Sequence, residues 1–276
     1  MGLIKSNFVG MVCSGATALF ISSAVAAFAQ TPAATPDFQS GNAGWVVINR
    51  DGLAPPPSGF GPTRADPNHP YIPNATFRIA DVTNPNLKPW AAEAMKKSND
   101  EVLAGKYPYT ARSSCMPAGV PGFSLFVVDP VFFVQSPKEI LIIYSGDQQV
   151  RRVWMNVPHT ARPTPSWYGE SVGHYEGDTL VVDTIGLNAR TFLDNYRTPH
   201  TEKLHVVERY RLTNDGRVLE TQIRVDDPDT FNEPWSATQR YGKVQQGPML
   251  EQVCAENTTD VGLFGNDIPQ AMRADF

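Results

Sequence analysis

LHVVERYRLTNDGRVLETQIRVD, residues 204–226, contains two runs in which apolar and polar side chains alternate, separated by Asp215-Gly216. This alternation is typical of strands with one buried face, and Asp-Gly is a preferred two-residue hairpin turn. If these two residues form the turn, Asn214 pairs with Arg217 and one face becomes almost wholly apolar. The segment therefore predicts an antiparallel β-hairpin packed on a core.

Similar runs recur along the chain and predict an all-β, mainly antiparallel fold. Short β-branched or aromatic runs broken by turn residues follow one another from Val131 onward. Consecutive strands must protect their edges, either as a lipocalin-like barrel or as a two-sheet sandwich, and both stay open here. The expected strands are 45–48, 131–136, 139–145, 149–156, 170–175, 178–184, 204–213, 218–226, 235–243 and 249–254.

One helix and one extended segment precede most of these strands. Pro89 in the first turn, apolar residues near helical spacing and Gly105 as a stop predict a helix over 89–104. Residues 30–88 are rich in Pro, Gly, Asn and Ala, which is typical of a wrapping extension. We expect residues 89–276 to form a single β domain with a leading helix.

Residues 1–29 have the pattern of a cleaved signal peptide. Lys5 is followed by an apolar stretch that ends in an Ala-x-Ala motif at 27–29. A membrane anchor is the alternative, but small polar residues interrupt the apolar stretch. The sequence therefore predicts a periplasmic or secreted protein.

Two cysteines remain after cleavage, because Cys13 lies in the signal peptide. Cys115 and Cys254 would fold in an oxidising compartment, which favours a disulfide between them. Two unpaired buried thiols are the alternative.

The charge of the chain bears on its partners. The net charge is −5, and it becomes −6 when Lys5 is removed from the 23 basic residues and set against the 28 acidic ones. Lys and Arg form no long block, so nucleic acid and anionic membranes are poor partners. We expect a small organic ligand or substrate.

Candidate site residues gather between Trp167 and Arg209. Ionisable groups are costly to bury unless they are paired or functional, so their density in a strand-rich segment indicates a site. The expected catalytic residues are Glu170, Asp183, His200, His205 and Glu208, and the expected ligand-binding residues are Trp167, His174, Tyr175, Tyr196 and Arg209. The aromatic members serve equally well as core residues.

A hairpin over residues 170–184 places two of these carboxylates. If Glu176-Gly177 is the turn, Glu170 lies directly opposite Asp183. Opposed like charges are unfavourable, so the pair should share a proton, bind a cation, or be bridged by an Arg or His. A solvated outer face or a different register is the alternative.

Glu208 lies on the apolar face of the 204–226 hairpin. Burial favours the neutral form of a carboxyl group, which would suit proton transfer, and an ion pair with a neighbouring Arg is the alternative. His205 and Arg209 lie on the opposite face, with His205 opposite Asp226. That face lines either a barrel lumen or the solvent.

A metal site is a further alternative for the histidines. Zinc would need a third ligand beside His200 and His205, drawn from His174, Asp183 or Asp194. The spacing of the two histidines matches no helical metal motif, and ordinary hydrogen-bonded histidines are commoner. We therefore predict no metal or other cofactor.

The segments PSWYGESVGHYEGDTLVVDT (165–184) and PHTE followed by LHVVER (199–209) carry a resemblance. Together they resemble a large family of exported bacterial proteins, and the resemblance extends from about Cys115 to Asn257. The resemblance implies that the protein is exported, and it implies no particular activity. Position 170 departs from the family pattern, which has histidine where this chain has Glu170.

These residues are compatible with three functions. The leading hypothesis is a lyase, dehydratase or isomerase that uses general acid and base catalysis, with Arg209 holding an anionic or carbonyl group. The alternatives are a lipocalin-like binding protein and a hydrolase that uses a metal-bound water.

Overall fold

The computed structural model describes residues 1–2, 35–39, 43–48, 52–70, 78–106, 109–111, 114–122, 129–245, 251, 253 and 254. The chain divides into two units, Met1–Pro32 and Ala33–Phe276. The expected signal peptide lies outside the described residues apart from Met1 and Gly2. Within the described ranges, no helix combines the length and apolar character needed to cross a bilayer.

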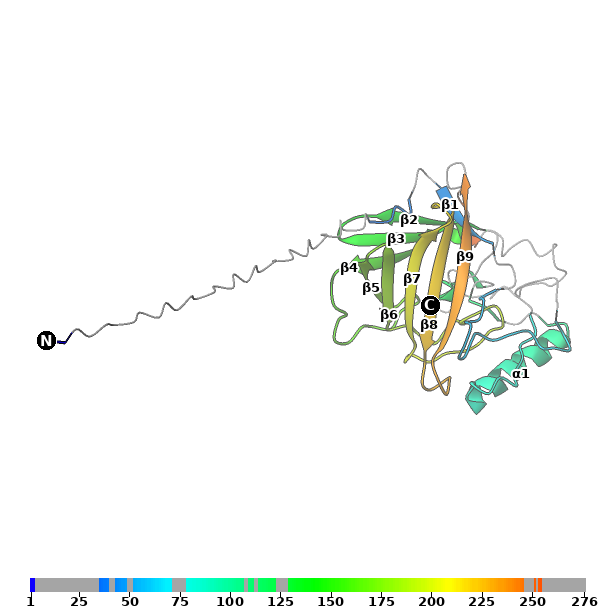
Figure 1. Cartoon of the computed structure of the whole chain (residues 1–276). Helices are drawn as coiled ribbons and strands as arrows, with labels where there is room; N and C mark the ends of the chain where they lie inside the picture. Colours follow the sequence, from blue (N-terminus) through cyan, green and yellow to red (C-terminus); the bar gives the residue numbers. More distant parts are fainter. Residues whose placement is uncertain are drawn as a thin grey trace. The chain divides into compact units, whose positions relative to one another are not determined.

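Nine strands close into a barrel in which neighbours in the sequence are neighbours in space, and β9 pairs with β1 (Figure 1). The barrel, and not the sandwich, is the architecture of this chain. The elements are β1 Ala43–Val47, α1 Pro89–Leu103, β2 Val131–Gln135, β3 Glu139–Tyr144, β4 Gln149–Met155, β5 Glu170–Glu176, β6 Thr179–Ile185, β7 His205–Thr213, β8 Val218–Asp226 and β9 Trp235–Gln245, with a 3₁₀ turn at Gly146–Gln148.

Most expected strands are present within one or two residues of their predicted ends. The barrel is closed by β1, which pairs with β9 over five residue pairs. A strand expected at 249–254 falls largely outside the described residues. Because β1 lies within the Pro-rich segment, this segment supplies the strand that completes the barrel.

The pairing of β4 with β5 is parallel, unlike the other pairs in the barrel. Val153 pairs with Ser171 and Met155 with Gly173. Parallel neighbours need a connection that runs back along the strand. Residues 156–169 make this return connection, which an antiparallel meander would not need.

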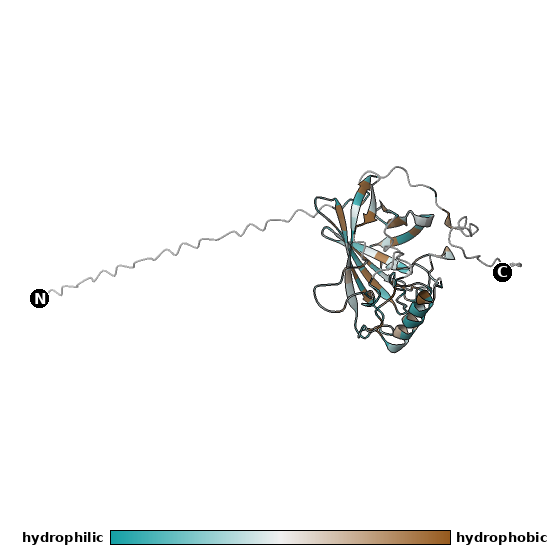
Figure 2. Ribbon diagram, turned by 90° about the vertical axis from the view of Figure 1, so that its right-hand side faces the viewer, coloured by the Kyte–Doolittle hydropathy of each residue, from teal (hydrophilic) through white to brown (hydrophobic). Residues whose placement is uncertain are grey.

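Two apolar clusters form the core, and the second of them also includes Ala91 and Met95 of α1. The strands carry both apolar and polar segments (Figure 2). One cluster includes Trp45 and Tyr144, and the other includes Trp235. Side chains alternate between the two faces of a strand, so the same strands present polar residues outward. These three aromatic side chains are almost completely buried.

Helix α1 packs through one row of small and apolar residues. Ala91, Met95 and Asn99 are buried and follow one another at intervals of four, which places them on one face. The side chain of Asn99 accepts a hydrogen bond from the backbone N–H of Ala80 and donates one to its carbonyl, both at 2.9 Å. The helix is thereby tied to the segment that precedes it.

The expected disulfide is present. Cys115 and Cys254 are bonded, with Cα atoms 5.5 Å apart and a sequence separation of 139. A covalent link over so long a loop restricts the unfolded chain, and in the chain-entropy model this stabilises the fold.

Candidate active site

The register of the β7–β8 hairpin is the predicted one and decides which residues face outward. His205 pairs with Asp226 and Thr213 with Val218, and the Arg217 N–H donates to the Asn214 carbonyl at 3.1 Å. Glu208 is fully buried, whereas His205 is partly exposed. The apolar face therefore lines the lumen, and His205 with Arg209 lies on the outer wall.

The predicted register of the β5–β6 hairpin is wrong. Glu176 pairs with Thr179, so Gly177 and Asp178 form the turn and Asp183 lies opposite Val172. Gly177 has a φ of 60°, in a turn whose first central position favours glycine. Glu170 is consequently opposite Ile185, a diagonal neighbour of Asp183 on the same face.

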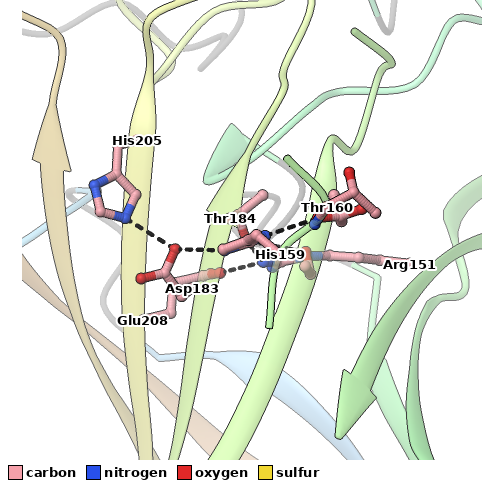
Figure 3. Close-up of polar contacts among 9 residues, drawn as sticks. Arg151, His159, Thr160, Asp183, Thr184, His205 and Glu208 are labelled. Carbon is pink, nitrogen blue, oxygen red and sulfur yellow. Dashed lines mark hydrogen bonds and ion pairs between the residues drawn. The ribbon is translucent and has the colours of Figure 1, made fainter. Parts of the chain in front are cut away.

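A bridging histidine nevertheless joins these two carboxylates, as one of the sequence alternatives required (Figure 3). Nδ1 of His159 lies 3.0 Å from Oε1 of Glu170, and its Nε2 lies 2.9 Å from Oδ1 of Asp183. The same oxygen of Asp183 lies 2.9 Å from Nε2 of His205. A continuous Glu–His–Asp–His chain thus crosses the outer wall of β5, β6 and β7.

His159 enters the site from the return connection between β4 and β5. This connection brings it over the outer faces of β5 and β6, where it is held from both sides. The backbone N–H of Thr160 donates to Oε1 of Glu170 at 2.7 Å and anchors the loop beside it. His159 was not among the residues predicted for the site, because only the parallel β4–β5 pairing brings this loop here.

The hydrogen bond between Asp183 and His205 fixes the position of one proton. An ionised carboxylate only accepts hydrogen bonds, so this contact needs a proton on Nε2 of His205. Each ring nitrogen of His159 faces a carboxylate oxygen. Nδ1 of His205 makes no hydrogen bond to any described residue and is open to accept a proton from a substrate.

The pKa values of His205, Asp183 and Glu170 are shifted in the directions that favour their charged forms. The hydrogen bond to Asp183 raises the pKa of His205, against a smaller opposing effect of burial. Burial acts to raise the pKa of Asp183, but hydrogen bonds from His205 and His159 outweigh it and the pKa is lowered. The pKa of Glu170 is lowered as well, because the Thr160 N–H and His159 outweigh burial.

These shifts predict a pH-dependent contribution to stability. A raised pKa of His205 means that its contribution is complete below about pH 6.5 and is lost as the pH rises through the folded-state value. A lowered pKa of Asp183 means that its contribution is present above about pH 3.9 and is lost as the pH falls through its folded-state value.

We therefore expect Asp183→Asn to cost more stability at about pH 5.5 than at about pH 8.5. Urea unfolding of the wild type and the variant at both pH values measures this difference. Equal losses at the two pH values would contradict the proposed Asp183–His205 coupling.

A second polar group lies inside the barrel. Arg151 and Glu208 form an ion pair at 2.6 Å with side chains 1% and 0% exposed. Arg151 also donates hydrogen bonds to Ser171 and Thr184, and the Tyr210 hydroxyl donates to Glu208 at 2.8 Å. Burial acts to lower the pKa of Arg151, but Glu208 outweighs it. Glu208 therefore forms the ion pair with an arginine that was the alternative to a role in proton transfer. The Glu208 carboxylate is inaccessible to solvent.

The other candidate histidines lie apart from this chain. His200 is buried in the β6–β7 connection, where its ring contacts the Thr191 hydroxyl at 2.8 Å and the Thr201 carbonyl at 2.9 Å. Burial lowers the pKa of His200. His174 is exposed on β5 and contacts Glu176 at 3.0 Å. Both have the contacts of ordinary hydrogen-bonded histidines.

The expected ligand-binding residues are scattered. Arg190 stacks over the ring of Trp167, and Arg78 over that of Tyr196. The Tyr175 hydroxyl accepts a hydrogen bond from Gln135 at 2.8 Å. No shared aromatic platform is formed by these contacts.

Arg209 lies on the outer wall, where it donates a hydrogen bond to Glu176 at 2.6 Å. Its charge is therefore already paired. Arg224, which no sequence argument selected, lies opposite Val207 and acts electrostatically on His205. The predicted β7–β8 register already places Arg224 on the same face as His205.

Within the described ranges, no three His, Cys, Asp or Glu side chains converge in an arrangement that would hold a metal ion. His159, Asp183 and His205 meet through direct hydrogen bonds between their side chains. No protein-family model matches the chain, and no curated protein matches it.

Proposed function

We propose that this protein is an exported enzyme that performs general acid and base catalysis on the outer wall of its barrel, with His205 as the proton carrier. One observation carries the proposal: Oδ1 of Asp183 lies 2.9 Å from Nε2 of both His159 and His205. A carboxylate that accepts a hydrogen bond from one nitrogen of an imidazole fixes the orientation of the ring. The other nitrogen can then act as a base that points in a fixed direction.

The remaining members of the chain hold this base in place. Asp183 fixes the His205 tautomer, His159 holds Asp183, and Glu170 holds His159 through its other ring nitrogen. His205 is 42% exposed, which gives a substrate access to Nδ1. It would take a proton from a carbon next to a carbonyl or carboxylate and return it to the product or the leaving group. Lyases, dehydratases and isomerases share this step.

A substrate screen with a proton-exchange readout tests the proposal. Carbonyl and carboxylate compounds with an acidic C–H are incubated with the protein in D₂O, and deuterium incorporation or product formation is followed by NMR. We expect exchange in the wild type and a loss of at least about 10²-fold in Asp183→Asn, whose side chain no longer balances the imidazolium. Exchange that is unchanged in Asp183→Asn would overturn the proposal, and activity abolished by EDTA would favour the metal hydrolase.

A lipocalin-like binding function is the second candidate, and one observation favours it. Oγ1 of Thr221, Nε1 of Trp235 and Nε2 of Gln239 are buried in the barrel and have no hydrogen-bond partner among the described residues. A buried polar group without a partner costs about 1–3 kcal/mol, so a bound molecule that pairs with them would stabilise the protein. Ligand binding without turnover that Trp235→Phe weakens would support this function.

A further inference from the structure

A second polar feature lies on the same outer wall as His205. A hollow of about 220 Å³ is lined by Thr179, Arg209, Arg211, Glu220 and Gln222 on β6, β7 and β8. His205, Arg209 and Arg211 are at alternate positions of β7, so all three face outward. The hollow therefore lies on the same strands and the same face as the proposed proton carrier.

The positive charges around the hollow differ in how they are neutralised. Arg209 is paired with Glu176 at 2.6 Å, and Arg240 is paired with Glu220 at 2.8 Å. Arg211, by contrast, is exposed and forms no ion pair within the part of the chain that the structure describes. Arg211 lies opposite Glu220 in the β7–β8 pairing, but the Glu220 carboxylate is bonded to Arg240, so the Arg211 guanidinium is presented to the hollow without an ion pair of its own.

A second such guanidinium lies between the hollow and His205. Arg224 is exposed on β8, opposite Val207, and likewise has no ion-pair partner among the described residues. Gln222, two residues before Arg224 on β8, also faces outward and lines the hollow. Polar and charged groups thus continue along β7 and β8 from the proton carrier to Arg211, with the carboxylates of Asp226 opposite His205 and Glu220 opposite Arg211 among them.

We propose that this strip binds an anionic oligomer, with one acidic unit on Arg211, a second on Arg224 and the reacting unit at His205. Guanidinium groups bind carboxylates and sulfates through paired, charge-assisted hydrogen bonds. The protein carries a net charge of −5, so general electrostatics would repel such a chain and local recognition is needed. This inference rests on the proposed function, because it assigns the substrate class of that site.

The length of the strip selects an oligomer over a small metabolite. Arg211 lies six residues after His205 on β7, and a rise of about 3.3 Å per residue separates them by about 20 Å. A single small acid cannot span this distance.

Binding of a defined acidic oligomer tests the proposal without requiring turnover. Hexagalacturonate is the carboxylate probe and a heparin hexasaccharide is the sulfate probe, each measured by calorimetry at low and high salt, with monomeric galacturonate for comparison. We expect one hexamer to bind, with an affinity that falls with salt and exceeds that of the monomer at least tenfold. We further expect Arg211→Gln and Arg224→Gln to weaken it about tenfold or more.

Arg152→Gln is the matched control, because Arg152 is an exposed arginine of β4 paired with Glu139 at 3.0 Å, outside the strip. It removes the same charge and should leave the affinity unchanged. The proposal is overturned if neither hexamer binds, if the monomer binds as tightly, or if Arg152→Gln weakens binding as much as Arg211→Gln.

The two proposals fail in different ways. His205→Gln should retain hexamer binding while losing proton exchange. Binding that depends on Arg211, together with exchange that survives His205→Gln, would refute the catalytic role of His205 and leave the anion site standing. Exchange that requires His205 on a neutral substrate, with no hexamer binding, would refute the anionic oligomer alone.

Discussion

His205→Gln is expected to lower kcat by about 10²- to 10⁴-fold and to leave the protein folded. Glutamine can still donate a hydrogen bond to Asp183, but its amide does not accept a proton at neutral pH. His205 is 42% exposed, so its replacement creates no cavity and removes little packing. Steady-state kinetics on the substrate found by the exchange screen, with circular dichroism for the fold, measure both effects.

His174→Gln is the matched control for this variant. His174 is an exposed histidine on the same outer wall and contacts Glu176 at 3.0 Å, outside the His159–Asp183–His205 chain. It should retain wild-type kcat. Equal losses in the two variants, or none in His205→Gln, would show that His205 does not carry the proton.

The largest loss of stability is expected for Arg151→Met. This change leaves the fully buried carboxylate of Glu208 without its counter-charge and removes the donor to Ser171 and Thr184. Breaking one side of a buried ion pair typically costs about 3–5 kcal/mol, because the remaining charge stays desolvated. Urea unfolding of the wild type and the variant gives the difference in the free energy of unfolding.

The double variant Arg151→Met, Glu208→Leu separates the ion pair from the packing around it. With both charges gone, no desolvated charge remains, and stability should recover to within about 1–2 kcal/mol of the wild type. Losses that simply add in the double variant would mean that the two side chains contribute independently. A partial exception is the Tyr210 hydroxyl, which loses its acceptor when Glu208 is replaced.

The β7–β8 hairpin shows what local sequence could predict. The Asp215-Gly216 turn and the single apolar face left one favourable register, and the structure has it. The β5–β6 hairpin shows the limit, because both Glu176-Gly177 and Gly177-Asp178 offer a glycine to the turn. With Glu176-Gly177 as the turn, Asp183 would lie opposite Glu170. With the observed Gly177-Asp178 turn, it lies opposite Val172.

The candidate site was predicted only in part for a related reason. Alternation along a strand is a local property, and it placed Glu170 and Asp183 on one face of their hairpin and His205 on the polar face of the next hairpin; the structure brings these three residues to the outer wall. His159 lies 24 residues before Asp183 and reaches it only because the connection between two parallel strands crosses the outer wall. Strand direction is a long-range property that no short window of sequence contains.

By itself, the sequence determined most of the strands, helix α1, the cysteine pair and the faces of the β7–β8 hairpin, all of which follow from local periodicity, turn residues and composition. Only the tertiary structure decided that the strands close into a barrel through β1 and that Glu208 is neutralised by Arg151. It also placed His159 between Glu170 and Asp183. Each of these contacts joins residues far apart in the chain, and closure of the barrel brings them within reach.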